Sequence, residues 1–258
     1  MYNTFSGDYD HFVNSTDHLV HEIPFIEQQI NSLQKTTTGQ PLDILDTACG
    51  TGIHAVTLAG LGHHVSGADL YPQMIEKSTQ NAHQAGVDIR FETAGLGDMA
   101  QTFGREQFDL LLCLDNSLPH LLSENELANA LSDFAACLRP GGVVLIQNYN
   151  FDAVMLLQER WMEPQTHFTK DAEWVFQRFY DFLPGRLVRF NIVTLKREGD
   201  SGWNAAVAST ILRPQLQIEL MRALTRAGFE KIREFGSMTG DDFSPDSSSD
   251  LILTAVRV

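Results

Sequence analysis

The stretch Leu45-Asp46-Thr47-Ala48-Cys49-Gly50-Thr51-Gly52 decides the fold that we expect for this chain. It follows a short apolar run and precedes a run with helical spacing, which is typical of a strand, a tight turn and a helix. Glycines at positions 50 and 52 let the backbone pass close to a ligand, where a Cβ atom would obstruct it. No Gly-Lys-Ser/Thr follows, so the turn is not a P-loop, and Ala55 replaces the third glycine of the dinucleotide fingerprint. By itself the turn is a weak signal for ligand binding, because a plain strand-to-helix turn has the same appearance.

Strands and helices are expected to alternate over the first 150 residues. Short apolar or β-rich runs lie at residues 42–47, 64–68, 89–93, 108–114 and 143–148. The best helical spacing between them is at residues 123–138, where Ser123 and Glu126 form a capping-box signature and residues 139–142 stop the helix. This alternation predicts an α/β, Rossmann-like fold with a mostly parallel sheet covered by helices on both faces.

After residue 150 the period of the polar and apolar pattern changes to two residues. Residues 173–182 and 187–197 alternate in polarity on either side of a turn at 183–186. A third strand is expected at residues 203–212. We therefore predict an antiparallel β insertion after the fifth strand of the main sheet.

The last segment is expected to return to the main sheet. A helix over residues 215–227, with Gly228 after its end, precedes strands at 230–235 and 251–256, which makes the main sheet seven-stranded. The predicted division of the chain is residues 1–152 for an N-terminal helix and the ligand-binding core, 153–212 for the insertion or substrate cap, and 213–258 for the return to the core.

Composition narrows the class of partner and the compartment. The formal net charge of −15 repels a phosphate backbone, and the densest basic cluster is the pair Lys196-Arg197, so we expect no nucleic-acid partner. No window holds the roughly 20 apolar residues that span a bilayer, and the polar start resembles no signal or transit peptide. Three cysteines without a CxxC pair indicate reduced thiols, which predicts a cytoplasmic protein without a membrane partner.

Acidic side chains follow the second and third strands. Asp69 ends the second strand, where an acidic side chain can bind both ribose hydroxyls of a nucleotide. Asp98, after the third strand, can accept a hydrogen bond from an exocyclic amine. The fourth strand ends at Leu114, beside the crevice where ligands bind in open α/β sheets. The alternatives are a helix cap before Pro72 for Asp69 and an ordinary loop acid for Asp98.

Taken in order, five segments of the chain closely resemble the successive motifs of class I S-adenosylmethionine-dependent methyltransferases. They read LDTACGTG, HHVSGADLYPQMIEKS, GDM, FDLLLCL and LRPGGVVLI. The resemblance covers about the first 150 residues at the spacing of the family. It implies a Rossmann-like fold, S-adenosylmethionine as the cofactor and S-adenosylhomocysteine as the product.

The resemblance also implies roles for residues around the glycine-rich turn. In the family this turn holds the methionine part of the cofactor. By the same match, Asp69 would bind the ribose, Leu70 and Met99 would pack on the adenine, and Asp98 would accept from adenine N6. The segment Gly7-Asp8-Tyr9-Asp10 looks like one in which a tyrosine covers the methionine carboxylate, although an N-terminal aromatic staple is the alternative for Tyr9. The predicted cofactor-binding residues are Tyr9, Asp46, Ala48, Cys49, Gly50, Gly52, Asp69, Leu70, Asp98, Met99 and Leu114.

The segment Asn116-Ser117-Leu118-Pro119-His120-Leu121 follows the fourth strand. It resembles the N-S-x-x-H-L stretch of glycine/sarcosine N-methyltransferases and the corresponding stretch of sugar N,N-dimethyltransferases. The match implies that His120 acts as a base or orients the substrate, and that Asn116 hydrogen bonds to substrate or cofactor. Packing of a helix-entry histidine beneath Leu121 and Leu122 is the alternative for His120.

Two positions depart from the glycine-methylating families. Tyr149 stands where an R-N-Y-D stretch has the arginine that clamps a substrate carboxylate, which puts glycine in doubt as the acceptor. Tyr149 would instead donate a hydrogen bond or form an aromatic wall with Phe151. Asp115 stands where glycine is common. A carboxylate there favours a cationic substrate such as a polyamine or an amino sugar, unless Asp115 only caps the loop.

These observations predict an enzyme that transfers a methyl group from S-adenosylmethionine to a small-molecule acceptor, foremost an amine nitrogen, with no metal. Transfer to oxygen, sulfur or carbon, aminopropyl transfer and a non-catalytic cofactor-binding module stay open on the same fold. A nicotinamide-dependent dehydrogenase is weakened by Ala55, and no carboxylate set builds the Mg²⁺ site of catechol chemistry. The aromatic-rich insertion would cover the substrate pocket or pair two subunits as a homodimer.

Overall fold

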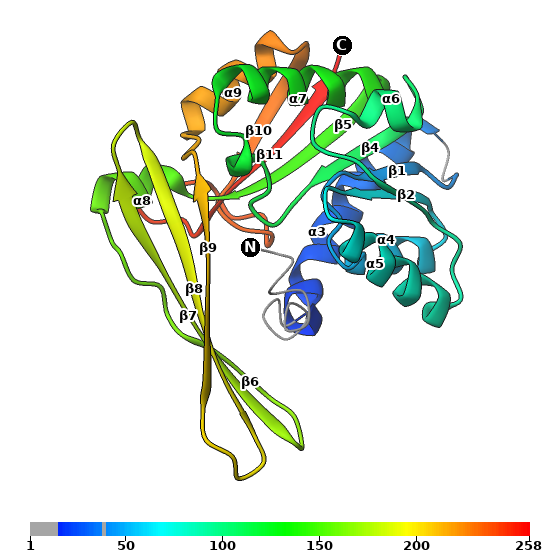
Figure 1. Cartoon of the computed structure of the whole chain (residues 1–258). Helices are drawn as coiled ribbons and strands as arrows, with labels where there is room; N and C mark the ends of the chain where they lie inside the picture. Colours follow the sequence, from blue (N-terminus) through cyan, green and yellow to red (C-terminus); the bar gives the residue numbers. More distant parts are fainter. Residues whose placement is uncertain (1–14, 38–39) are drawn as a thin grey trace.

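A seven-stranded sheet lies at the centre of the computed structural model, which describes residues 15–37 and 40–258 (Figure 1). Its strands are β1 (Asp43–Asp46), β2 (His64–Asp69), β3 (Arg90–Thr93), β4 (Phe108–Cys113), β5 (Leu138–Tyr149), β10 (Phe229–Phe235) and β11 (Asp250–Arg257). They lie in the order β10-β11-β5-β4-β1-β2-β3, and β11 runs antiparallel to both of its neighbours while the other pairs are parallel. The predicted seven-stranded, mostly parallel sheet is confirmed.

Helices cover both faces of this sheet. They are α3 (Ser15–Thr37), α4 (Ile53–Gly60), α5 (Pro72–Ala85), α6 (Met99–Phe103), α7 (Glu124–Cys137) and α9 (Gln217–Arg226). One face packs its alternate strand residues, such as Leu111 and Ile146, against α6, α7 and α9. The other packs Leu110 and Leu145 against α3 and α4, and α5 contacts α4. Two apolar cores therefore lie on either side of one sheet.

The capping box of α7 is present as predicted. The Ser123 hydroxyl accepts from the Glu126 backbone N–H at 3.2 Å, and the Glu126 carboxylate accepts from the Ser123 N–H at 2.8 Å. The helix ends at Cys137, within one residue of the prediction, but the next strand is expected from residue 143, whereas β5 already begins at Leu138 without an intervening loop. Leu138 pairs with Phe108 before a register shift, so the segment with two glycines forms a strand irregularity instead of a stop.

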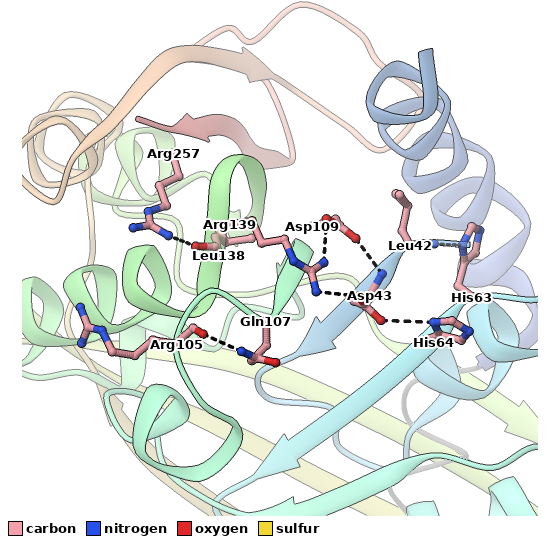
Figure 2. A network of polar contacts seen from close by, with 10 residues as sticks. All are labelled: Leu42, Asp43, His63, His64, Arg105, Gln107, Asp109, Leu138, Arg139 and Arg257. Atoms are coloured by element: carbon pink, nitrogen blue, oxygen red, sulfur yellow. Dashed lines mark hydrogen bonds and ion pairs between the residues drawn. The ribbon is translucent and has the colours of Figure 1, made fainter. Parts of the chain in front are cut away.

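Contacts between charged side chains join the starts of four strands at the amino-terminal edge of the sheet (Figure 2). Arg139 of β5 donates to Asp109 of β4 and to Asp43 of β1, each at 2.8 Å. Asp109 also accepts from the backbone N–H of Asp43 at 2.9 Å, and His64 of β2 contacts the Asp43 carboxylate at 3.2 Å. Charged side chains thus join the amino-terminal ends of the strands at this edge. Ligands of open α/β sheets bind at the carboxyl ends of the strands, so a ligand site is expected at the opposite edge.

The predicted antiparallel insertion is a four-stranded sheet that extends from the body of the molecule (Figure 1). Its strands, in the order β6-β7-β8-β9, are β6 (Gln165–Phe168), β7 (Ala172–Leu183), β8 (Leu187–Glu198) and β9 (Asn204–Leu212). The sequence analysis missed the four-residue β6 and the seven-residue helix α8 (Phe151–Leu157), because β6 has one apolar residue and α8 is apolar on every side, so neither shows a periodic pattern. Phe151 packs with Tyr180 and Phe190 in a separate apolar cluster at the base of this sheet.

Two further observations concern the environment of the chain. Among the described residues, no helix has the length and apolar character needed to cross a bilayer. Cys49, Cys113 and Cys137 are buried and free thiols.

The division of the chain into residues 1–152, 153–212 and 213–258 stays a prediction.

Candidate active site

The glycine-rich turn leads from β1 into α4 at the carboxyl edge of the sheet. Gly50 and Gly52 have φ angles of +54° and +80°, in the left-handed region that favours glycine. A Cβ atom on Gly52 would lie 2.8 Å from the Ser78 Cβ atom of α5. The turn is also tied to β2, since the Cys49 N–H donates to the Ala68 carbonyl at 2.8 Å. Both glycines therefore serve the turn, and Gly52 also serves the packing of α5.

Asp69 connects this turn to the start of α5. Its carboxylate accepts from the Gly50 N–H at 3.0 Å and from the Tyr71 N–H at 2.9 Å. Burial raises the pKa of Asp69, while these two hydrogen bonds oppose the shift. The bond to Tyr71 fixes the residue before α5, but Tyr71 is itself the N-cap residue and no side chain of the described residues caps the helix, so the helix-cap alternative for Asp69 is wrong. A carboxylate oxygen can accept more than one donor, so ribose binding by Asp69 stays a prediction.

Asp46 ends β1 directly before the turn and is 2% exposed. Its Oδ2 atom has no hydrogen-bond partner among the described residues, although buried polar atoms ordinarily have one. Burial raises the pKa of Asp46 to about 7; nearby His54 opposes the shift, and the carboxylates of Asp115 and Asp69 reinforce it. A cationic ligand with an N–H donor would satisfy this oxygen. The ammonium and sulfonium groups of S-adenosylmethionine fit these charges.

A buried ion pair that the sequence analysis missed lies next to Asp46. His54, in the first turn of α4, contacts the Glu22 carboxylate of α3 at 2.7 Å, and the two side chains are 6% and 5% exposed. Burial disfavours the charged imidazole, but the hydrogen bond to Glu22 and the carboxylates of Asp115, Glu22 and Asp46 raise the pKa of His54 to about 9. Glu22 lies four residues before Ile26 on the buried face of its helix, and this placement could have identified it.

Leu70 and Asp98 lie on either side of Gly95. A Cβ atom on Gly95 would be 3.5 Å from the Leu70 Cδ1 atom and 3.6 Å from the Asp98 Oδ2 atom. Leu70 is 61% exposed, and Asp98 precedes α6 without capping it through its side chain. An apolar surface beside a carboxylate is the environment predicted for adenine. Met99 is fully buried in the core and its N–H donates to Asp133, so the structure gives it a packing role.

The acceptor turn, defined here as residues 114–120, follows β4. Leu114 is buried, and the next two residues, Asp115 and Asn116, have φ angles of +54° and +60°. Non-glycine residues adopt this region at a cost that the surrounding structure must offset. The offset comes from β5, since the Asn116 N–H donates to the Gln147 carbonyl and its Oδ1 accepts from the Tyr149 N–H, each at 3.1 Å. Asn116 thus has a structural role beside its predicted ligand contact.

His120 ends a single 3-10 turn, η1 (Leu118–His120), and is half-buried. Burial lowers the pKa of His120 to about 4, so its imidazole is neutral near pH 7. A neutral imidazole with such low basicity accepts a hydrogen bond, but it is a weak general base because its protonated form is unfavourable near pH 7. Of the two roles predicted for His120, the structure therefore fits orientation of the substrate better than action as a base.

Tyr149 ends β5 and meets the insertion. Its hydroxyl accepts from an Nη atom of Arg178 on β7 at 3.5 Å, and burial raises the pKa of Tyr149. The hydroxyl of Tyr180, also on β7, is buried without a hydrogen-bond partner among the described residues. An arginine therefore approaches the position where the R-N-Y-D stretch would have one, but from another element. Sequence reasoning missed Arg178 because it lies 29 residues away along the chain.

The structure thus brings most of the predicted residues to one edge of the sheet. Asp46 is within electrostatic range of Asp69 and Asp115, Asp115 also acts on Tyr149, and the Tyr149 N–H donates to Asn116. Cys49 is buried, Ala48 is half-buried, and both belong to the turn. Tyr9 lies outside the described residues. Within the described ranges, no group of three or more His, Cys, Asp or Glu side chains is arranged to hold a metal ion.

Comparisons with known proteins agree with this geometry. Residues 44–142 match the family model described as a methyltransferase domain. A glycine/sarcosine N-methyltransferase from Aphanothece halophytica is 29% identical over 165 residues, which are 60% of this chain and 61% of that protein. The matched segment thus spans about three fifths of this curated relative.

Solved structures share the fold over nearly the whole chain. An S-adenosylmethionine-dependent methyltransferase from Clostridium acetobutylicum has a TM-score of 0.79 at 15% identity, covering 99% of this chain and 98% of that one. A sugar N-methyltransferase from Streptoalloteichus has a TM-score of 0.75 at 21% identity, covering 96% and 92%. The fold is that of the Rossmann-like methyltransferases. Over residues 44–142 the chain matches a methyltransferase domain, and its fold is similar to that of solved S-adenosylmethionine-dependent methyltransferases, which agrees with the predicted class and cofactor.

Proposed function

We propose that this chain transfers the methyl group of S-adenosylmethionine to an amine nitrogen of a small molecule. The observation that carries the proposal is the position of Asp115, an exposed carboxylate at the end of β4. Its charge acts on Asp46 at the cofactor turn and on Tyr149 at the base of the insertion. The carboxylate is therefore near both halves of the site, where a cationic acceptor would approach. The names of the glycine/sarcosine and sugar N-methyltransferases support an amine.

The residues of the chain have separable tasks in such a reaction. When bound, the cofactor supplies a methyl group on a sulfonium, which is already a strong electrophile. Asp46 and the glycine-rich turn would hold its methionine part, and Asp69, Leu70 and Asp98 its nucleoside part. Holding the acceptor in line with the reacting bond can contribute on the order of 7–11 kcal/mol to lowering the barrier. The acceptor turn and the insertion are the elements placed to do this.

An amine must lose a proton before its lone pair can attack. Asp115, although exposed, would attract the ammonium form to the site, because opposite charges interact favourably over a short distance. The neutral imidazole of His120 would then accept a hydrogen bond from the amine N–H and orient the nitrogen. Since the pKa of His120 is lowered to about 4, the proton passes on to water instead of staying on the imidazole.

We infer that Arg178 and Tyr149 contact the part of the acceptor that is not methylated. Arg178 presents a guanidinium group next to a tyrosine hydroxyl at the base of the insertion. Guanidinium groups bind carboxylates and other oxygen-rich groups with directional hydrogen bonds. The acceptor would then carry its amine toward Asp115 and an oxygen-bearing group toward Arg178.

The proposal also covers the kind of acceptor, the compartment and the oligomeric state. A net charge of −15 favours a small-molecule acceptor over a nucleic acid and suits a protein of the cytoplasm. Pairing of two subunits through the insertion stays a prediction, which light scattering on the purified chain would test.

The experiment is a product assay on matched acceptors. Formation of S-adenosylhomocysteine is measured with a panel of primary and secondary amines and with the corresponding alcohols, for the wild type and Asp115→Asn. We expect turnover with amines and an increase in amine KM of about tenfold in the variant, since one charge-assisted contact is lost. Turnover with alcohols alone would overturn the amine assignment, and equal amine KM values in both proteins would overturn the role of Asp115. Methylthioadenosine formed when decarboxylated S-adenosylmethionine replaces S-adenosylmethionine in the assay would indicate aminopropyl transfer.

A further inference from the structure

A cavity of about 310 Å³ lies between α7 and α9 and is distinct from the cofactor turn. Figure 1 shows these two helices beside each other on one face of the main sheet. The polar side chains of its wall include Gln215 and three arginines, Arg213, Arg222 and Arg226. Its volume is at the lower end of the range of about 300–1,000 Å³ for small-molecule pockets.

The three arginines concentrate positive charge in an otherwise acidic chain. Arg222 and Arg226 are four residues apart on α9 and therefore lie on the same side of the helix. Neither forms an ion pair with another described residue. Arg213, in the link before α9, has a side chain that is only 17% exposed. Guanidinium groups that line one cavity repel each other, and a bound anion relieves this repulsion while accepting several charge-assisted hydrogen bonds.

The carboxylates at the same cavity do not cancel this charge. Glu219 is held by both Nη atoms of Arg186, at 2.9 and 3.3 Å, and these contacts keep its pKa below its usual range although burial opposes them. Glu124 contacts Arg213 at 3.3 Å, but its side chain is 84% exposed. Because the Glu124 side chain is largely in water, this contact contributes little and can open at low cost. The excess charge at the cavity is therefore positive.

The cavity is also connected to the acceptor turn through backbone and amide contacts. The Arg213 N–H donates to the Pro119 carbonyl at 2.8 Å. Gln215 is fully buried, donates to the Leu118 carbonyl at 2.9 Å, and accepts from the Asn148 side chain at 3.1 Å. Both residues at the cavity thus hold the turn that ends in His120.

We propose that the cavity between α7 and α9 is a binding site for a small, multiply charged oxyanion bearing phosphate or carboxylate groups. Arg222 and Arg226 bind the anion from α9, and Arg213 binds it from the opposite end. This site is separate from the cofactor site, and binding there does not depend on the proposed methyl transfer.

Binding at this site stabilises the position of Arg213 and, through its backbone, of the acceptor turn. An anion that orders Arg213 lowers the entropic cost of holding His120 in place when the acceptor binds. The KM for the acceptor then falls in the presence of the anion. This second consequence rests on the proposed function, whereas the binding itself does not.

Calorimetric titration of the full chain with inorganic pyrophosphate and with citrate tests the site, at an ionic strength kept constant with KCl. The test variant is Arg222→Gln/Arg226→Gln. The control is Arg105→Gln/Lys170→Gln, which removes the same net charge from exposed positions elsewhere. We expect saturable binding by the wild type and the control, and binding at least about tenfold weaker in the test variant.

Each outcome distinguishes part of the proposal. Binding of pyrophosphate alone assigns phosphate as the recognised group, and binding of citrate alone assigns carboxylate. No saturable binding of either probe, or equal weakening in both variants, overturns the site. If the probe binds but leaves the acceptor KM of the wild type unchanged, the proposed connection to the acceptor turn is wrong. The anion site itself is then still supported by the binding. A fall in KM that disappears in Arg213→Gln supports the connection.

Discussion

The two halves of the candidate active site are built in different ways. On the cofactor half, Asp46, Asp69 and His54 are buried, and the Asp69 carboxylate is held by the N–H groups of the glycine-rich turn and of the residue before α5. On the acceptor half, Asp115 is exposed and Tyr149 meets Arg178 from the distant insertion. A buried, locally assembled half suits a ligand that is the same in every reaction, whereas an open half assembled from remote segments suits an acceptor that differs among relatives.

The largest effect should come from breaking the buried ion pair of the cofactor half. Glu22→Ala leaves the His54 imidazolium without its partner, which we expect to reduce the free energy of unfolding by about 3 kcal/mol at pH 7. The pKa of His54 is raised above its unfolded value, so the stabilisation is fully present below pH 6.5 and is lost as the pH rises through about 9. Urea unfolding at pH 6 and pH 10 measures it.

The matched control for this variant is Glu27→Ala, a partly exposed position on the same helix. Its effect on unfolding should be small and nearly independent of pH. If Glu22→Ala lost as much stability relative to the wild type at pH 10 as at pH 6, the ion pair would not be the source of the stabilisation.

A second test removes the carboxylate that joins the glycine-rich turn to α5. Asp69→Ala leaves the Gly50 and Tyr71 N–H groups without their acceptor and removes the predicted ribose contact. We expect S-adenosylmethionine to bind about 100-fold more weakly, as measured by calorimetry. Asp88→Ala, an exposed aspartate before β3, serves as the control and should bind as the wild type does. Equal affinities in all three proteins would remove Asp69 from the cofactor half.

His120 tests whether the acceptor half acts independently of the cofactor half. For His120→Gln we expect kcat/KM for the acceptor to fall about tenfold, because one orienting hydrogen bond is lost, with unchanged affinity for S-adenosylmethionine. Since the pKa of His120 is lowered to about 4, the wild-type profile should show no loss of activity from this histidine between pH 6 and 8. Weaker cofactor binding in the variant would show that the two halves are not separable.

The smallest effect concerns the proton on Asp46. At pH 7 a carboxyl group with a pKa of about 7 is half protonated, and a bound cation lowers that pKa. Binding of S-adenosylmethionine should then release about half a proton, seen as a dependence of the calorimetric enthalpy on the ionisation enthalpy of the buffer. The release should vanish at pH 9 and in Asp46→Asn. Release that persists in Asp46→Asn would assign the proton to another group.

The contrast between local and remote contacts also explains which features could be predicted from the sequence. The parallel strands, the capping box of Ser123 and the strands of the insertion depend on local periodicity and local hydrogen bonds, so their patterns are readable. The early start of β5 at Leu138 depends on pairing with Phe108, which local signals do not report. The pair of Glu22 with His54 and the approach of Arg178 to Tyr149 join segments distant in sequence. A single sequence holds no direct record of such contacts.

The central claim is that the carboxyl edge of the main sheet binds S-adenosylmethionine. Calorimetric titration of the wild type with S-adenosylmethionine, S-adenosylhomocysteine and NAD⁺ tests it most directly. We predict one site for each of the first two ligands, with a Kd on the order of 10 µM, and no binding of NAD⁺. No binding of S-adenosylmethionine, or tighter binding of NAD⁺, would contradict the claim and leave the glycine-rich turn of residues 47–52 as a structural turn or a site for another nucleotide.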